Sequence, residues 1–178
     1  MSPRFYVCIT MTRPQNMERI CEFYLRGLDD HPFEIRLLIG VQGNEPDPKG
    51  VNKCNEMIDL VPDGCWFSCI ADDTLEHPTL LKRVAKLIDE HQEAGAFVFG
   101  GKRNAGTIFH AVPENMHDGC VCGSQIVLNK SFIGSHRFEY SKYGDRCDGK
   151  LINTIFTQYP DKVVLVDEPL RYFGSLEW

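Results

Sequence analysis

The chain has 178 residues, of which 43% are hydrophobic and 25% are charged, and its formal net charge is −6. This length suffices for one domain with a full core, so we expect a single domain over residues 1–178. The acidic balance disfavours a nucleic-acid partner, and the lack of an apolar run of about 18 residues argues against a membrane span.

The first half of the chain alternates predicted strands and helices. Apolar runs predict four strands, over residues 5–10, 33–41, 65–71 and 96–99. Apolar residues at helical spacing predict three helices, one after Pro14, one over residues 51–61 and one from Pro78. The Gly- and Pro-rich residues 42–50 are expected to form a loop, and Gly100-Gly101 is expected to end the fourth strand.

The second half of the chain is less regular. Residues 102–122 and 130–144 show no clear periodicity, whereas residues 123–129 and 163–166 are predicted strands and residues 151–159 a predicted helix. Since the first half reads strand–helix–strand throughout, the sequence favours an α/β fold. We expect a three-layer α/β/α sandwich with a mainly parallel wound sheet.

Two adjacent carboxylates, Asp72 and Asp73, follow the third predicted strand. Acidic groups at the carboxyl end of a buried strand are costly unless they hold a cation or sugar hydroxyls, and ligands of open α/β sheets bind at this end. Both can serve one ligand only if the strand ends there and turns, which Thr74 permits. We therefore predict a metal–diphosphate site. The alternative is a solvated turn whose acids cap the helix from Pro78.

Four segments, taken in order, resemble the GT-A glycosyltransferase fold, and most of all the family 2 type of sugar transferases. They are residues 9–14, 49–55, 64–78 and 143–148. In that family a nucleotide-sugar-binding half comes first, here about residues 1–101, and an acceptor half follows, here about residues 102–178. The resemblance implies an inverting, hexosyltransferase-type enzyme that moves a sugar from a nucleotide-diphosphate sugar to an acceptor hydroxyl.

The resemblance also implies roles for the two acids. Asp73 would hold Mn²⁺ or Mg²⁺ on the diphosphate, and Asp72 would bind ribose or sugar hydroxyls. Hard oxygen ligands and bridging phosphates suit these ions. The family's first acidic position falls on Ala71, so this chain carries Asp-Asp in place of Asp-x-Asp.

By the same resemblance, Asp145 is the predicted catalytic base and Asp148 a substrate-binding residue. Inverting transfer needs one base to take the proton of the acceptor hydroxyl, and no second carboxylic acid. Asp145 matches the family's first acidic position, but Arg146 replaces the second, so whether Asp145 or Asp148 is the base stays open. Both could instead be helix N-caps.

The residues expected to bind the nucleotide-sugar are Thr10, Thr12, Arg13, Gln42, Asn44, Lys53 and Asn55. The family usually reads uracil with an Asp after the second strand, where this chain has Gln42 and Asn44. These amides could bond a base edge or serve as turn residues. Uridine, thymidine and guanosine donors therefore stay open, with a UDP-sugar favoured. Arg13 and Lys53 could reach phosphate or base, or could lie on a solvated surface.

Two other functional classes are compatible with the sequence. One is a non-catalytic nucleotide-sugar or glycan-binding module of the same fold, which the departures at Ala71 and Arg146 motivate. The other is a nucleotidyltransferase, which is disfavoured because residues 10–14 contain no glycine. A glycan or another hydroxyl compound is the expected acceptor, and it should be small or exposed because the acceptor half is short.

The eight cysteines are predicted to be mostly free thiols, because several fall inside predicted strands or helices. We therefore expect a reducing, cytoplasmic compartment.

Residues 171–178 resemble the family's tail after the last strand, which can fold over the donor. A frayed terminus is the alternative.

Overall fold

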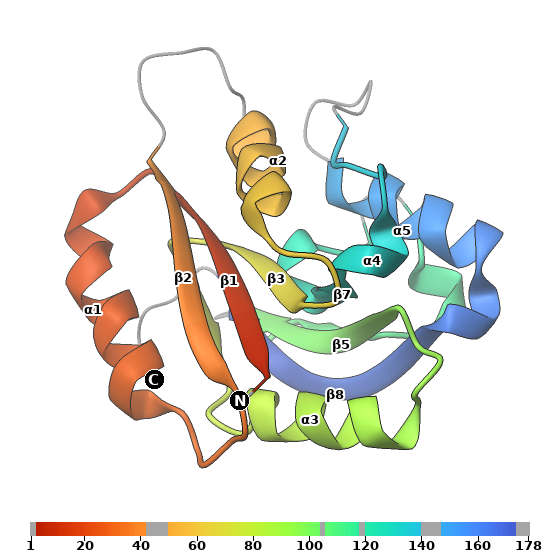
Figure 1. Cartoon of the computed structure of the whole chain (residues 1–178), viewed down its shortest axis with the longest axis horizontal. Helices are drawn as coiled ribbons and strands as arrows, with labels where there is room; N and C mark the ends of the chain where they lie inside the picture. Colours follow the sequence, from red (N-terminus) through yellow and green to blue (C-terminus); the bar gives the residue numbers. More distant parts are fainter. Residues whose placement is uncertain (1–2, 42–49, 104–105, 118–119, 140–146, 174–178) are drawn as a thin grey trace.

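The computed structural model describes residues 3–41, 50–103, 106–117, 120–139 and 147–173. A curved sheet forms the centre of the molecule, and helices pack on both of its faces (Figure 1). The fold is thus α/β with helical layers on either side of the sheet, as the strand–helix alternation of the first half indicated.

The sheet contains eight strands in the described residues. They are β1 (Arg4–Met11), β2 (Glu34–Val41), β3 (Trp66–Ala71), β4 (Thr74–Glu76), β5 (Ala96–Arg103), β6 (Ile108–Phe109), β7 (Ile126–Asn129) and β8 (Val163–Phe173). Their order is β2-β1-β3-β7-β5-β8-β4, with β6 paired to β5. The four strands expected in the first half correspond to β1, β2, β3 and β5, with boundaries that agree within a residue except for the longer β5.

The sheet is mixed, so the expectation of a mainly parallel sheet is not confirmed. Strands β1–β2, β1–β3 and β5–β8 pair in parallel. Strands β3–β7, β5–β7, β5–β6 and β4–β8 pair antiparallel. The antiparallel pairings all involve β4, β6 or β7, whose two to four residues are too short to show a period in the sequence.

Five α-helices connect and cover these strands in the described part of the chain. They are α1 (Met17–Glu22), α2 (Val51–Leu60), α3 (Leu80–Glu90), α4 (Lys130–Ile133) and α5 (Cys147–Gln158). A 3₁₀ turn at Pro14–Asn16 precedes α1, and a π-helical turn at Phe23–Gly27 follows it. None of the helices described here is both long and apolar enough to cross a bilayer.

Two apolar layers hold the helices against the sheet. One face of the sheet packs on α2, α4 and α5, through residues such as Ile58, Ile133 and Ile152. The opposite face packs on α1 and α3, through residues such as Ile20 and Leu81. Helix α3 is amphipathic, and its apolar residues at helical spacing are the buried ones. The expected apolar faces are therefore the ones that form the core.

Strand β5 continues through Gly100-Gly101 instead of ending there. Its pairing with β8 is irregular at these two glycines. A side chain at Gly100 would place its Cβ 3.0 Å from the backbone of Glu168, so the glycine permits close packing of two strands. Likewise, β8 extends well past residue 166 to Phe173, so Arg171 belongs to a central strand and not to a tail.

The cysteines with described side chains are all free thiols, as predicted. They are Cys8, Cys21, Cys54, Cys65, Cys69, Cys120 and Cys122. Hydrogen bonds with Cys54 and Cys8, together with burial, raise the pKa of the Cys69 thiol well above its usual value. Cys69 therefore acts as a small, uncharged core residue.

Candidate active site

The carboxyl ends of β1 and β3 meet at one edge of the sheet. The two strands are parallel neighbours, and Thr10 of β1 lies in register with Ala71 of β3. The backbone N–H of Asp72 still donates to the Thr10 carbonyl at 3.2 Å, just past the end of β3. The chain segments that leave β1 and β3 are therefore held side by side, where ligands of α/β sheets bind.

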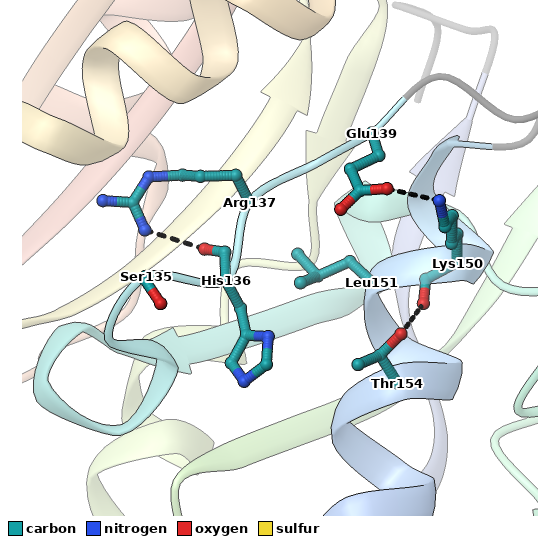
Figure 2. Close-up of a pocket in the computed structure, with 7 residues that line it drawn as sticks. All are labelled: Ser135, His136, Arg137, Glu139, Lys150, Leu151 and Thr154. Atoms are coloured by element: carbon teal, nitrogen blue, oxygen red, sulfur yellow. Dashed lines mark hydrogen bonds and ion pairs between the residues drawn. The ribbon is translucent and has the colours of Figure 1, made fainter.

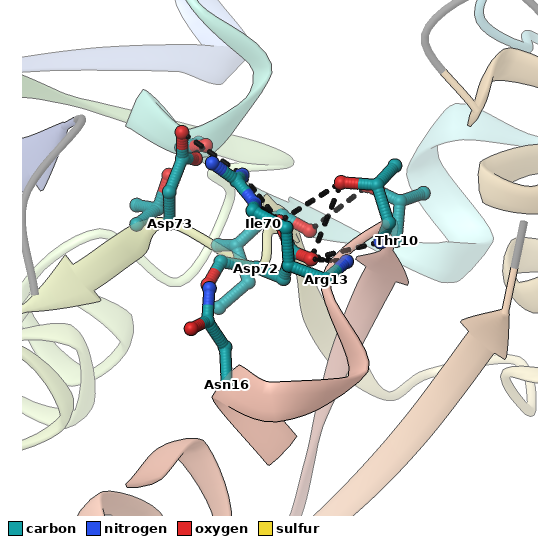
Figure 3. Close-up of polar contacts among 9 residues, drawn as sticks. Thr10, Arg13, Asn16, Ile70, Asp72 and Asp73 are labelled. Atoms are coloured by element: carbon teal, nitrogen blue, oxygen red, sulfur yellow. Dashed lines mark hydrogen bonds and ion pairs between the residues drawn. The ribbon is translucent and has the colours of Figure 1, made fainter.

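Asp72 is the centre of the polar contacts at this edge (Figure 3). Its side chain is 1% exposed. Its Oδ2 accepts the backbone N–H of Thr12 at 2.8 Å and that of Arg13, and its Oδ1 accepts Nε–H of Arg13 at 2.9 Å. Nη2 of Arg13 also donates to Oδ1, and Asn16 Nδ2 donates to the Asp72 carbonyl at 3.0 Å. Asp72 thus fixes the turn after β1.

These contacts keep Asp72 ionised. Burial by itself would raise the pKa of Asp72, but the hydrogen bonds from Arg13 and Thr12 and the charge of Arg13 outweigh it, so the pKa lies below its usual value. In return, the hydrogen bond to Asp72 is the main reason that the pKa of Arg13 is raised. Both groups are therefore charged at neutral pH.

Asp73 is placed differently from its neighbour. Its side chain is 34% exposed, and its Oδ2 lies 3.0 Å from Nη2 of Arg13. Figure 3 shows Asp73 beyond the guanidinium that also contacts Asp72. Two carboxylates against one guanidinium leave one net negative charge at this edge. A diphosphate placed here would be repelled unless a cation came with it.

The donor set at this edge fits a hard divalent cation that is bound together with a diphosphate. Asp73 offers a partly exposed carboxylate, and the described residues contain no group of three or more acidic, His or Cys side chains that could hold a metal alone. Mg²⁺ is commonly held by one or two carboxylates plus substrate phosphates and water. One protein carboxylate, with phosphate oxygens, is enough for such a site.

Thr10 and Gly50 bring β1 and α2 close together. Thr10 is buried, and its hydroxyl donates to the Ile70 carbonyl at 3.4 Å. Gly50 precedes α2 with φ +69°, and a Cβ there would lie 2.9 Å from Thr10 Cγ2. A glycine is required by both the left-handed backbone and the close approach. The start of α2 therefore lies next to the carboxyl end of β1.

The two predicted donor-binding residues on α2 have contacts within the protein. Lys53 is partly buried, and its Nζ lies 2.9 Å from Glu56. Asn55 Nδ2 donates to the Phe138 carbonyl at 2.9 Å, and its Oδ1 accepts the Phe138 N–H at 3.0 Å. Asn55 thus links α2 to the segment before residue 140. Its predicted contact with the donor stays a prediction.

We expect Asn55→Ala to lower the free energy of unfolding by about 1.5 kcal/mol, because both backbone groups of Phe138 lose their partner. That corresponds to a fall of about 4 °C in Tm for a chain of this size. Leu60→Ala on the same helix is the control, since Leu60 is 68% exposed. Equal Tm values for the two variants would show that the Asn55–Phe138 contact contributes nothing.

Several predicted site residues lie outside the described residues. Gln42, Asn44 and Asp145 are among them, and their roles remain predictions. Asp148 lies in the first turn of α5, but its side chain is outside the described part. Of the two predicted acceptor-side acids, the structure therefore describes only the backbone of Asp148.

A small open hollow lies between α5 and residues 135–139 (Figure 2). Its volume is about 130 Å³, and it is lined by Ser135, His136, Arg137, Glu139, Lys150, Leu151 and Thr154. Lys150 pairs with Glu139 at its edge, and Arg137 pairs with Asp59 of α2. This hollow is open and lined mainly by polar side chains, and the expectation that the acceptor is small or exposed stays a prediction.

Solved structures share this fold. The structure matches residues 1–349 of S. aureus TarS with a TM-score of 0.64 and 15% identity over 96% of this chain and 60% of that chain. The same TarS segment in complex with UDP-GlcNAc matches with a TM-score of 0.65 and 16% identity, over 98% of this chain and 59% of that chain. A glycosyltransferase involved in the glycosylation of the major capsid of PBCV-1 matches with a TM-score of 0.56 and 10% identity, over 99% of this chain and 95% of that chain.

These matches confirm that the chain has a glycosyltransferase fold. The chain spans about 60% of the length of TarS 1–349, whereas it covers 95% of the PBCV-1 protein. No family model matches the sequence, and no curated protein matches it. The matches extend over nearly the whole chain, so the shared fold covers both the first and the second half of the sequence.

Proposed function

We propose that this chain is an inverting, metal-dependent glycosyltransferase that uses a nucleotide-diphosphate sugar. The observation that carries the proposal is the cluster of Asp72, Asp73 and Arg13 at the carboxyl ends of β1 and β3. It lies where α/β folds bind nucleotides, and it combines one buried acid with one accessible acid. The glycosyltransferase fold of the chain supports this interpretation.

We propose a UDP-sugar as the donor. TarS, which shares the fold, was solved in complex with UDP-GlcNAc and with UDP. Thr10, Thr12, Arg13 and the start of α2 would surround the nucleotide at the edge of the sheet. Gln42 and Asn44 would reach the base, as expected from their place after the second strand.

Asp73 would hold Mn²⁺ or Mg²⁺. The bound ion supplies positive charge that stabilises the leaving diphosphate. Asp72 acts on the site indirectly, because its carboxylate is enclosed by Thr12 and Arg13. We therefore propose that Asp72 mainly holds Arg13 and the turn after β1, and that Asp73 is the group that binds the metal ion.

In the transfer step, the acceptor hydroxyl oxygen forms a bond to the anomeric carbon of the sugar. The bond between that carbon and the oxygen of the diphosphate breaks, and the nucleoside diphosphate leaves with the electron pair. Asp145, or Asp148 in its place, takes the proton of the acceptor hydroxyl. Attack from the face opposite the leaving group inverts the anomeric configuration.

We place the acceptor on the side of α5. The hollow lined by residues 135–139 and α5 combines an apolar surface at Leu151 with hydroxyl and imidazole groups at Ser135 and His136. Sugars are bound by such mixed surfaces, and the size of the hollow suits one small unit. A glycan or another exposed hydroxyl compound is therefore the proposed acceptor. A cytoplasmic location stays a prediction.

A non-catalytic module of the same fold is the second candidate. It is favoured by the pairing of Arg13 with both acids, which partly neutralises the proposed metal site, and by Arg146 in place of the family's second acid. Such a module would bind a nucleotide-sugar without breaking it.

Release of nucleoside diphosphate from nucleotide-sugars decides between the two candidates. We expect the protein to release UDP from a UDP-sugar in the presence of Mn²⁺, slowly with water and faster with a suitable glycan. Chelation of the metal should stop the release. Binding of UDP-sugar without any release in a panel of hydroxyl acceptors would favour the non-catalytic module, and no binding would contradict both.

A further inference from the structure

A fully buried ion pair lies inside the apolar layer between the sheet and helices α1 and α3. Glu76 of β4 and Arg171 of β8 are both 0% exposed, and Nη1 of Arg171 contacts Oε1 of Glu76. The two residues are register partners in the antiparallel β4–β8 pair. Ser68 of β3 also lies close, with its Oγ 3.5 Å from the same carboxylate oxygen.

This ion pair is incompletely hydrogen-bonded. In the described part of the chain, Glu76 Oε2 and Arg171 Nε and Nη2 are buried without a hydrogen-bond partner. Burial, followed by the charge of Glu76, raises the pKa of Tyr24 well above its usual value, so the tyrosine of α1 faces the pair as a neutral group. A buried pair with unmet hydrogen bonds is often no more stable than an apolar pair of similar size. Stability alone therefore does not account for it.

The position of the pair relates it to the proposed metal site. Asp73 lies in the two-residue connection between β3, which ends at Ala71, and β4, which begins at Thr74. Strand β4 has only three residues, and it pairs with β8 through residues 74–76. Besides this backbone pairing, Glu76–Arg171 is the charged contact that joins the two strands. Asp73 is therefore held by β3 and Asp72 on one side and by β4 on the other.

We propose that the buried Glu76–Arg171 pair positions Asp73, by fixing the short strand β4 against β8 and so holding the β3–β4 turn. The inference rests on the proposed function only in its consequence for metal binding. The structural part of it concerns β4 alone. Glu76 and Arg171 are positioning residues, since both are fully buried and neither meets the ligand.

The test uses the double variant Glu76→Met/Arg171→Met. A single substitution would leave one charge buried and unpaired, whereas the apolar pair removes both charges and should fold. Glu93→Met/Lys162→Met is the matched control, because this ion pair at 2.7 Å is exposed on the surface. Glu76→Asp is the second variant. It keeps the charge but shortens the side chain, so it tests the geometry if the double variant does not fold.

Three quantities are measured for each variant: Tm, hydrogen exchange of the amides in residues 74–77, and the affinity for Mn²⁺ in the presence of UDP. We expect the double variant to keep a Tm near that of the wild type. Its amides at residues 74–77 should exchange faster than those of the wild type, whereas the exchange in β1 should stay unchanged. Its Mn²⁺ affinity should fall by about tenfold, as is typical when groups that orient a metal ligand are removed. Glu76→Asp should change exchange and affinity in the same direction.

Unchanged exchange at residues 74–77 in a folded variant would overturn the proposal, and so would faster exchange with unchanged Mn²⁺ affinity. The failure of the proposed function would look different. In that case the wild type itself would bind no Mn²⁺ with UDP, while the exchange at residues 74–77 would still decide whether the pair fixes β4.

Discussion

Asp73→Asn should reduce metal-dependent turnover of the donor by roughly 1000-fold, since charge stabilisation by a catalytic metal contributes several kcal/mol to the transition state. The amide keeps the size of the side chain but loses the negative charge that the cation needs. The affinity for Mn²⁺ in the presence of UDP should fall along with turnover. Titration calorimetry and a UDP-release assay measure the two effects.

Asp89→Asn is the matched control for this variant. Asp89 is an exposed acid on α3, so the same change in charge should leave both measurements unaltered. Asp73→Asn should also leave Tm nearly unchanged, because its carboxylate is partly exposed and its ion pair with Arg13 is solvated. Retained metal-dependent turnover in Asp73→Asn would contradict the assignment of Asp73 as the metal ligand.

Asp72→Asn, unlike Asp73→Asn, should cause a large loss of stability. The amide group would face the donors of Thr12 and Arg13, and the charge of Arg13 would lose its buried partner. We expect the free energy of unfolding to fall by about 3 kcal/mol. For a chain of this size, Tm should fall by about 8 °C. A Tm loss no larger than that of Asp73→Asn would show that the buried contacts of Asp72 contribute little.

The loss of stability in Asp72→Asn should depend on pH in a defined direction. The pKa of Asp72 is lower in the folded protein than in the unfolded chain, so its contribution to stability is present at pH values above the unfolded pKa of about 4. It is lost as the pH falls through the lower, folded pKa. The Tm difference between wild type and Asp72→Asn should therefore be constant from pH 7 to about 5 and shrink below about pH 4. A difference that grows on acidification would contradict this interpretation.

The first half of the fold could be predicted from the sequence because its elements are long and periodic. Strand β1, for example, is a continuous apolar run that is buried on both faces, and helix α3 carries its buried apolar residues at helical spacing. The placement of Asp72 and Asp73 at the carboxyl end of a strand could also be predicted, because they follow an apolar run. Patterns of this kind are local, so each element can be identified from its own residues without knowledge of its partners.

Short and irregular elements could not be predicted. Strands β4 and β6 have three and two residues, so their pairing depends on distant partners and not on their own sequence. Gly100-Gly101 signalled a break, whereas the structure uses Gly100 for close packing against Glu168. Arg171 was expected to begin the tail after the last strand, whereas it lies within β8 and is buried against Glu76, ninety-five residues away in sequence.

The different environments of Asp72 and Asp73 could not be predicted from the sequence either. Adjacent Asp residues suggested that both would meet the ligand. The structure encloses Asp72 with backbone N–H groups and Arg13 and leaves Asp73 partly exposed. This difference depends on how the turn after β1 folds back on the end of β3, which a linear motif does not specify. Thr12 and Arg13 were expected to contact the donor, and their contact with Asp72 was not foreseen.

The most direct test of the proposed site is a thermal-shift measurement with uridine, thymidine and guanosine diphosphates, each with and without Mn²⁺. A ligand that binds the folded protein raises Tm, so the shift reports binding without a known acceptor. We predict stabilisation by UDP at millimolar concentration that requires Mn²⁺ and disappears in Asp73→Asn. No shift with any of the nucleotides, or an equal shift without metal, would contradict a metal-dependent nucleotide-sugar site at Asp73.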